Sequence, residues 1–160
     1  MPEAITNTSP LLYLYRIGAV NWLPQLFNEI WCPNAALNEL LEGQQRGHDV
    51  PSPNDYTWLQ IVDPRALPSE WLASDLGAGE IAVMALALEN PSRVVLLDDA
   101  LARQIAQAAG LTVWGTLRVL LEAKLQGLTS AVAPHLDELQ NSGMWISASV
   151  RQRVLDLANE

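Results

Sequence analysis

The feature that most constrains the fold is an apolar run followed closely by a strand-like run that ends in two acids. Ile81 to Leu88 is apolar at every position, so a helix there would be buried on all sides. Val94 to Leu97 follows, begins with two β-branched residues and ends at Asp98-Asp99. A buried helix that leads into a buried strand is typical of α/β proteins, in which helices connect parallel strands.

The rest of the chain repeats this alternation of strand-like and helix-like runs. The other predicted strands are Ala4–Asn7, Glu29–Cys32, Trp58–Val62 and Leu111–Val113. The predicted helices are 11–16, 22–27, 35–42, 79–89, 101–109, 116–126, 131–140 and 147–158, with irregular segments at 44–55 and 63–77. Thr8 and Ser9 are predicted caps for the first helix, and Gly43 a predicted stop for the third. No segment has the composition of an interdomain linker, so the pattern predicts one α/β domain over residues 1–160 with a mainly parallel sheet.

Charge limits the kinds of partner that the chain can bind. Nine basic residues and eighteen acidic ones give a net charge of −9, and Lys124 is the only lysine. Proteins that bind nucleic acid by neutralising phosphates usually carry a basic face. Contact with nucleic acid would therefore need a few arginines, a bound cation or a basic partner.

The compartment can also be predicted. Cys32 is the only cysteine, which excludes an internal disulfide and favours a reducing environment. The first residues, MPEAITNTSPLL, lack the features of a signal peptide, and no apolar run reaches the ~18 residues of a membrane span. We expect a cytoplasmic protein that has no contact with membranes.

Acidic side chains stand where a parallel sheet would bind a ligand. Ligands of such sheets bind beyond the carboxyl ends of the strands. Asn7 and the pair Asp98-Asp99 end predicted strands, Glu80 lies in the first turn of the apolar helix, and Glu39 borders the inward face of its helix. Each acid also has a purely structural explanation. Glu80 can interact favourably with the helix dipole, Glu39 can be a solvated helix residue, and one of the two aspartates can cap the next helix. If the carboxylates meet, a hard cation such as Mg²⁺ or Mn²⁺ would relieve their repulsion and favour metal-assisted hydrolysis.

Other features predict less. No P-loop and no zinc-type spacing of cysteine and histidine is present. Six tryptophans are spread between Trp22 and Trp145. This spread predicts packing in the core or at an interface rather than a row that stacks on bases.

Four segments occur in a distinctive order: NTSPLLYLYRIG, FNEIWCPNAALNEL, GAGEIAVMALAL and VVLLDDALARQIAQAAGLTVWGTLRVLLEAKLQGL. Together with a later MWIS and an amphipathic helix, they resemble PIN-domain-like proteins, relatives of the VapC-like toxins. The resemblance covers nearly the whole chain. It implies a three-layer α/β/α fold around a parallel sheet of about five strands, and a Mg²⁺- or Mn²⁺-dependent ribonuclease site.

The resemblance also implies a role for each site residue. The implied roles are catalysis for Glu39, Glu80, Asp98 and Asp99, metal binding for Asn7, Glu80 and Asp99, and substrate positioning for Ser9 and Thr116. One departure matters, because most PIN nucleases have aspartate where this chain has Asn7. An amide oxygen can bind Mg²⁺, but it brings no negative charge and cannot take up a proton.

Three functions remain open at this stage. The first is an endoribonuclease that acts on RNA and is the toxin of a toxin–antitoxin pair. The second is a catalytically weakened PIN fold that binds nucleic acid or a partner, such as a basic antitoxin segment or a second copy. The last helix has apolar positions that could contact such a partner, although packing on the chain's own core is favoured: Val150, Val154 and Leu157. The third is a phosphoryl-transfer domain in which Asp98 or Asp99 accepts the phosphoryl group. It is disfavoured because a receiver-type domain needs a lysine near its last strand, and Lys124 lies inside a helical pattern instead.

Overall fold

The computed structural model describes residues 1–72 and 74–160; residue 73, in the predicted irregular segment 63–77, lies outside the described residues. Within them the chain forms a five-stranded sheet in the order β3-β2-β1-β4-β5, and every pairing is parallel. The strands are β1 (Ala4–Thr6), β2 (Ile30–Cys32), β3 (Leu59–Ile61), β4 (Val94–Leu96) and β5 (Thr112–Trp114). The predicted α/β class with a parallel sheet is confirmed.

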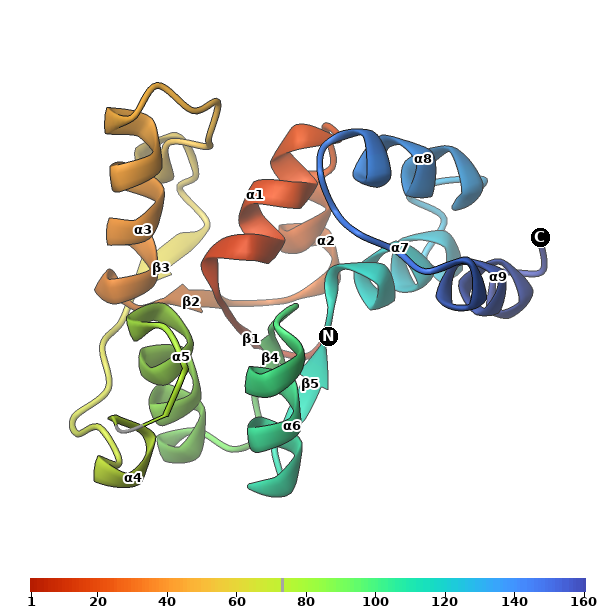
Figure 1. Cartoon of the computed structure of the whole chain (residues 1–160). Coiled ribbons are helices and arrows are strands. Elements are labelled where there is room, and N and C mark those ends of the chain that lie inside the picture. The colour runs from red at the N-terminus through yellow and green to blue at the C-terminus, as the bar shows by residue number, and fades with distance from the viewer. Residues whose placement is uncertain (73) are drawn as a thin grey trace.

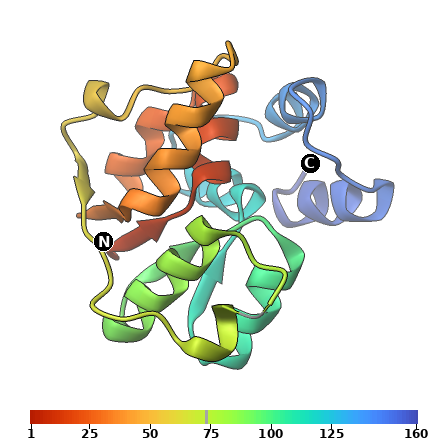
Figure 2. The same cartoon turned by 60° about the vertical axis from the view of Figure 1, so that its left-hand side comes forward.

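Helices cover both faces of this sheet. The main helices are α1 (Thr8–Arg16), α2 (Leu23–Leu26), α3 (Asn34–Gln45), α4 (Ser69–Leu72), α5 (Ala78–Glu89), α6 (Ala100–Ala108), α7 (Thr116–Leu125), α8 (Ala133–Asn141) and α9 (Ala148–Leu157). Figure 1 shows α1, α2 and α3 on one side of the sheet and α5 and α6 on the other, which makes three layers. The last two helices, α8 and α9, lie together at one side of the molecule (Figure 2).

The strand order reverses in the middle of the sheet. From β1 the chain proceeds to β2 and then to the edge strand β3, after which it returns to β4 and β5 on the other side of β1. Because parallel crossovers are right-handed, the reversal places the connecting helices on opposite faces. The carboxyl ends of β1 and β4 therefore lie at a switch point, where sheets of this kind bind their ligands.

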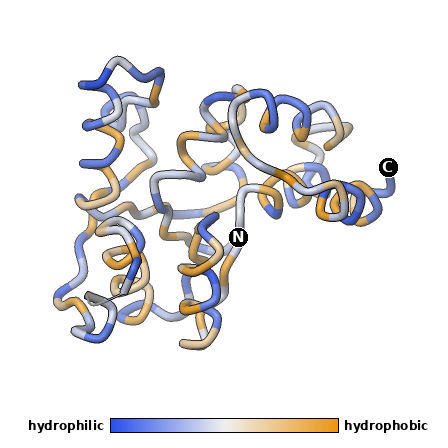
Figure 3. The backbone as a smooth tube through the Cα atoms, viewed as in Figure 1, coloured by the Kyte–Doolittle hydropathy of each residue, from blue (hydrophilic) through white to orange (hydrophobic). Residues whose placement is uncertain are grey.

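The apolar helix predicted after residue 78 is buried as expected. Eight of the twelve residues of α5 are buried, and the helix contacts both β1 and β4. Figure 3 shows the hydrophobic colouring along α5. A helix so deeply buried holds its first turn, and with it Glu80, firmly against the central strands.

Several predicted boundaries are wrong for identifiable reasons. Neither Thr8 nor Ser9 caps α1, because the helix already begins at Thr8, whose hydroxyl donates instead to the Ala36 carbonyl on α3. Gly43 does not end α3, which continues for two residues, and the chain turns at Gly47, where φ is +80°. A short helix, α4, lies inside the segment predicted to be irregular.

The last helix packs on the core through only part of its predicted apolar face. Val154 is buried, whereas Val150 and Leu157 are exposed, so the preference for core packing at these two positions is wrong. Among residues 1–72 and 74–160, no helix combines the length and apolar composition that crossing a membrane would need.

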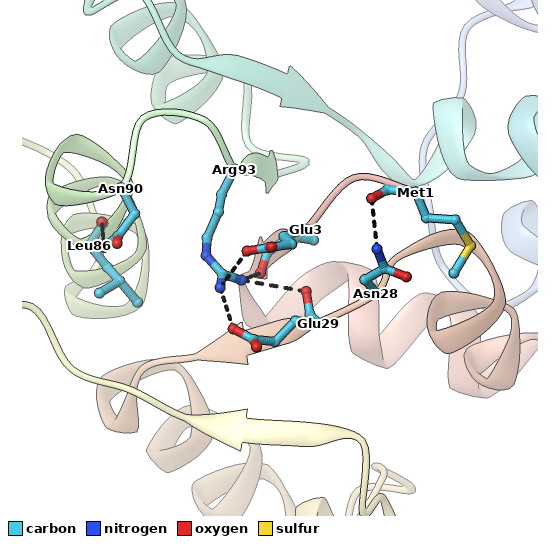
Figure 4. A network of polar contacts seen from close by, with 8 residues as sticks. Met1, Glu3, Asn28, Glu29, Leu86, Asn90 and Arg93 are labelled. Atoms are coloured by element: carbon cyan, nitrogen blue, oxygen red, sulfur yellow. Dashed lines mark hydrogen bonds and ion pairs between the residues drawn. The ribbon is translucent and has the colours of Figure 1, made fainter.

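A buried arginine holds the amino ends of three neighbouring strands together. Glu3, Glu29 and Arg93 each directly precede a strand, and Figure 4 shows the arginine between the two acids. Arg93 is only 4% exposed; it forms ion pairs with both glutamates, donates to the Ala4 and Glu29 carbonyls and stacks on the Trp31 ring at 3.3 Å. The charges at this end of the sheet are paired.

Candidate active site

The opposite end of the sheet carries the predicted acids. A pocket of about 390 Å³ opens there, beyond the carboxyl ends of β1 and β4. Its lining residues are Ser9, Tyr13, Glu80, Asp98, Asp99, Arg103, Leu117, Met144 and Trp145. Asn7, Glu39 and Thr116 do not line the pocket but contact or adjoin residues at this end of the sheet.

Asn7 and Glu39 lie close together behind the first turn of α5. Asn7 follows β1 and is only 2% exposed, and its Oδ1 atom is buried without a hydrogen-bond partner. Glu39 reaches over from α3 and accepts hydrogen bonds from the Thr8 hydroxyl at 2.9 Å and the Gly79 backbone N–H at 3.1 Å. A buried amide oxygen without a donor is costly. It is therefore an available ligand for a cation.

Gly79 permits this close approach of three elements. A Cβ atom on Gly79 would lie 2.8 Å from Glu39 Oε1 and 2.9 Å from Asn7 Oδ1. Only a residue without a side chain lets the first turn of α5 come this near to both groups. The glycine thus determines the spacing between α5, α3 and the end of β1.

The two adjacent aspartates have different partners, as predicted for acids that follow a buried strand. Asp99 is the N-cap of α6 and accepts from the Ala102 backbone N–H at 2.9 Å. Asp98 accepts from both the backbone N–H and the hydroxyl of Thr116, each at 2.7 Å. Burial raises the pKa of Asp98, and the Thr116 hydrogen bonds and the nearby Arg103 charge offset part of the rise. Thr116, itself buried, orients Asp98.

Glu80 connects the two groups of acids. Burial raises the pKa of its carboxyl, and the negative charges of Glu39 and Asp99 raise it further. Glu80 therefore lies within electrostatic reach of an acid on each side. Loss of its proton at neutral pH adds a charge to a region where negative charges already repel one another.

The donor set fits a hard divalent cation. Its members are oxygen atoms: one orphaned amide oxygen and carboxylates that repel one another, which is the chemistry that Mg²⁺ and Mn²⁺ select. In residues 1–72 and 74–160, however, no three acidic, histidine or cysteine side chains form a ready-made metal-binding group. Glu39, Asp98 and Asp99 each accept hydrogen bonds from the protein itself.

Sequence reasoning missed five of the residues that line the pocket, among them the charged Arg103 and the exposed Trp145. Arg103 follows Asp99 by one turn of α6, and a basic residue at that spacing from an acid was an available signal. Trp145 was assigned to packing in the core or at an interface, yet it is 86% exposed and lines the pocket. Nothing in its local sequence indicates that exposure, which depends on how the turn after α8 lies against the rest of the chain.

Two other reactive groups can be assigned to structural roles. Cys32 ends β2, and burial, with smaller effects of Glu39 and Asp63, raises the pKa of its thiol to about 12. It is therefore protonated at neutral pH and a poor nucleophile. Lys124 donates to the Ala158 carbonyl and pairs with Glu160, so it lies on the α9 side of α7 and does not line the acidic pocket. A receiver-type phosphoryl-transfer domain needs a lysine near its acceptor aspartate, and the lining residues of the acidic pocket include no lysine.

Comparison with protein families agrees with the fold of the chain. The family model DUF3368, described as a PIN domain, matches residues 3–160. No curated protein matches the chain.

Proposed function

The chain belongs to the PIN-domain family DUF3368, and we propose that its acidic pocket is the active site of a divalent-metal-dependent endoribonuclease. PIN domains have a nuclease-like fold and generally use divalent metal ions. The observation that supports this proposal most is the buried, unpartnered Oδ1 of Asn7 beside Glu39. Buried polar atoms in proteins nearly always have a hydrogen-bond partner, so an oxygen left without one supports a site that a ligand completes.

The proposed metal ligands are Asn7, Glu80 and Asp99, and the proposed ion is Mg²⁺ or Mn²⁺. When bound, such an ion lowers the pKa of a coordinated water and offsets the charge that develops on a scissile phosphate. Ser9 lines the pocket and can donate its hydroxyl hydrogen bond to a substrate phosphate oxygen. Asn7 carries no charge, so the ligand set holds one negative charge fewer than a set with aspartate there.

The catalytic acids have distinct roles in this proposal. Glu80, whose pKa is raised, takes up a proton more readily than an ordinary carboxylate and suits the role of base for the attacking water. Asp98 is held by Thr116 and can orient that water. Glu39 has both oxygens engaged by Thr8 and Gly79, so it supports α5 and Asn7 from behind.

Cleavage of an unstructured RNA in Mg²⁺, Mn²⁺ and EDTA tests this proposal. We expect cleavage that EDTA abolishes and that Glu80→Gln and Asp99→Asn each reduce by about 10²-fold or more, because each removes a charged ligand. Glu42→Gln, an exposed carboxyl on α3, is the matched control and should cleave normally. Mg²⁺ should also raise the Tm of the unmodified chain but not that of Glu80→Gln. Cleavage that persists in EDTA, or in Asp99→Asn, would contradict the assignment.

A second proposal concerns a partner, and it makes the chain the toxin of a toxin–antitoxin pair. A groove of about 500 Å³ lies between α7 and α9, where Leu125 is 77% and Leu157 is 62% exposed. The net charge of −9 favours a basic partner, so a small antitoxin with a basic, partly apolar segment suits this groove. A second copy of the chain is the competing occupant. Light scattering of the purified chain and of Leu157→Ser separates them, because only a homodimer would already be present and dissociate in the variant.

A further inference from the structure

One aromatic side chain at the pocket is exposed although its neighbours are anchored. Trp145 follows α8 in a turn where Gly143 has φ +109°. The Met144 backbone N–H donates to the Leu139 carbonyl at 3.0 Å, and the Gln140 side chain donates to the Ile146 carbonyl at 3.3 Å. Ile146 is buried in the core. The turn is thus fixed on both sides of the indole, which projects into solvent from a rigid support.

The exposed indole of Trp145 lines the acidic pocket. Of the large hydrophobic side chains that are exposed in residues 1–72 and 74–160, only Trp145 lines this pocket. Tyr13, Leu117 and Met144 line it as well, so apolar and aromatic groups stand in the same pocket as Asp98 and Asp99. An exposed aromatic surface beside polar catalytic groups is a suitable platform for a flat ligand.

The pocket also contains a cation that is not engaged elsewhere. Arg103 is the basic residue of the pocket lining, and it takes part in none of the side-chain hydrogen bonds and salt bridges found in the described residues. Its Nη1 atom and Asp98 Oδ1 both lie against Gly115, within 3.2 Å of where a Cβ would stand, so its charge acts on Asp98 without a hydrogen bond between them. A guanidinium with its donors unused can bind a phosphate oxygen.

We propose that Trp145 stacks on an unpaired nucleobase of single-stranded RNA while Arg103 contacts a neighbouring phosphate. This inference rests on the proposed nuclease function and names two residues that would bind its substrate. In a duplex the bases are stacked on one another and their faces are closed, so the indole can reach a base only in a single strand. Stacking does not depend on base identity, so the platform predicts little sequence preference.

A protein partner is the other conceivable use of an exposed tryptophan. The position of Trp145 favours RNA, because it shares one pocket with the acids and with Arg103, whereas the apolar groove between α7 and α9 lies elsewhere. The experiment below therefore measures RNA affinity and oligomeric state on the same variants.

The test uses the full chain with Glu80→Gln, which blocks turnover, and a fluorescein-labelled oligouridine in Mg²⁺. Fluorescence anisotropy should show that Trp145→Ala weakens binding about tenfold, since stacking of one base contributes that much or more. Trp145→Phe should retain most of the affinity. Arg103→Ala should weaken binding and lower the salt dependence by about one phosphate contact. Leu125→Ala, an equally exposed apolar residue in the other groove, is the control and should bind normally.

Each outcome has a defined meaning. Unchanged oligouridine affinity in Trp145→Ala, or equal weakening for a duplex of the same length, would refute the inference. So would dissociation of a dimer in Trp145→Ala at unchanged RNA affinity, which would assign the indole to a protein contact. Trp145-dependent binding, together with no cleavage of RNA by the chain that retains Glu80, would support the stacking platform and refute the nuclease. Cleavage with an unchanged KM in Trp145→Ala would do the reverse.

Discussion

The two ends of the parallel sheet differ in whether their charged side chains are paired. At the amino end, Arg93 is surrounded by Glu3, Glu29 and the Trp31 ring, and every charge has an opposite neighbour. At the carboxyl end, Glu39, Glu80 and Asp99 repel one another, and the pocket lining there holds Arg103 as its cation. Paired charges hold strands together, whereas unpaired ones raise the free energy of the folded chain and create affinity for a cation.

This comparison indicates which end is structural and which is functional. The amino end makes the fold more stable, because its buried guanidinium is paired with two carboxylates. The carboxyl end keeps an orphaned amide oxygen and a carboxyl of raised pKa, both of which a bound ion would satisfy. Substitutions at the two ends should therefore differ in whether they change stability or ligand binding.

The largest effect on stability is expected at Arg93. Arg93→Met removes a buried guanidinium and leaves two acids without their partner, so the free energy of unfolding should fall by about 3 kcal/mol. Urea denaturation measures the change. Arg118→Met is the control: Arg118 pairs with Glu122 on the surface of α7, and its loss should cost less than about 1 kcal/mol. Equal costs for both arginines would contradict the structural role of the amino end.

A smaller effect on stability, with a large one on function, is expected at Gly79. In Gly79→Ala the new Cβ would displace Glu39 and Asn7 at an overpacking cost of about 1–3 kcal/mol, of which helix propensity returns about 1 kcal/mol. Mg²⁺-dependent thermal stabilisation and RNA cleavage should both be lost. Gly43→Ala on α3 is the matched control, because its Cβ would meet Val50 at an acceptable 3.4 Å and should leave both readouts unchanged. Retained Mg²⁺ binding in Gly79→Ala would show that Asn7 is not a ligand of the ion.

The smallest effect is a pH dependence that originates at Glu80. The folded chain holds the Glu80 proton at pH values where the unfolded chain has lost it, because the folded-state pKa is raised. The unfolded state binds fewer protons in that range, so stability falls as pH rises through it, and the penalty persists above the folded-state pKa. In EDTA, Glu80→Gln should therefore have a higher Tm than the unmodified chain at pH 7. The two Tm values should converge below about pH 4.

Glu42→Gln provides the reference for this pH series, because Glu42 is exposed and lies outside the pocket. Its Tm should follow that of the unmodified chain at every pH. If Glu80→Gln also followed it, neither burial nor repulsion by Glu39 and Asp99 would penalise the charge of Glu80 in the folded chain.

Much of the fold could be predicted because its signals are local. The apolar helix before β4, the strand that ends at Asp98-Asp99 and the cap from Asp99 all follow from runs of neighbouring residues. The predicted helix boundaries were wrong where residues outside the local sequence determined the structure. Thr8 could not be a cap because its hydroxyl is engaged by α3, and Gly43 did not stop a helix that could continue to a better turn at Gly47.

The sequence by itself determined the α/β alternation, the strand ends that carry acids and the resemblance to PIN domains, since hydrophobic periodicity and motif order are properties of the chain. Only the tertiary structure decided which of these acids meet. The reversal of strand order at β1 brings Asn7 beside the residues that follow β4, and the glycine at 79 lets Glu39 approach from another layer. The burial of Arg93 and the exposure of Trp145 belong to the same category, because solvent access depends on elements that are distant in sequence and adjacent in space.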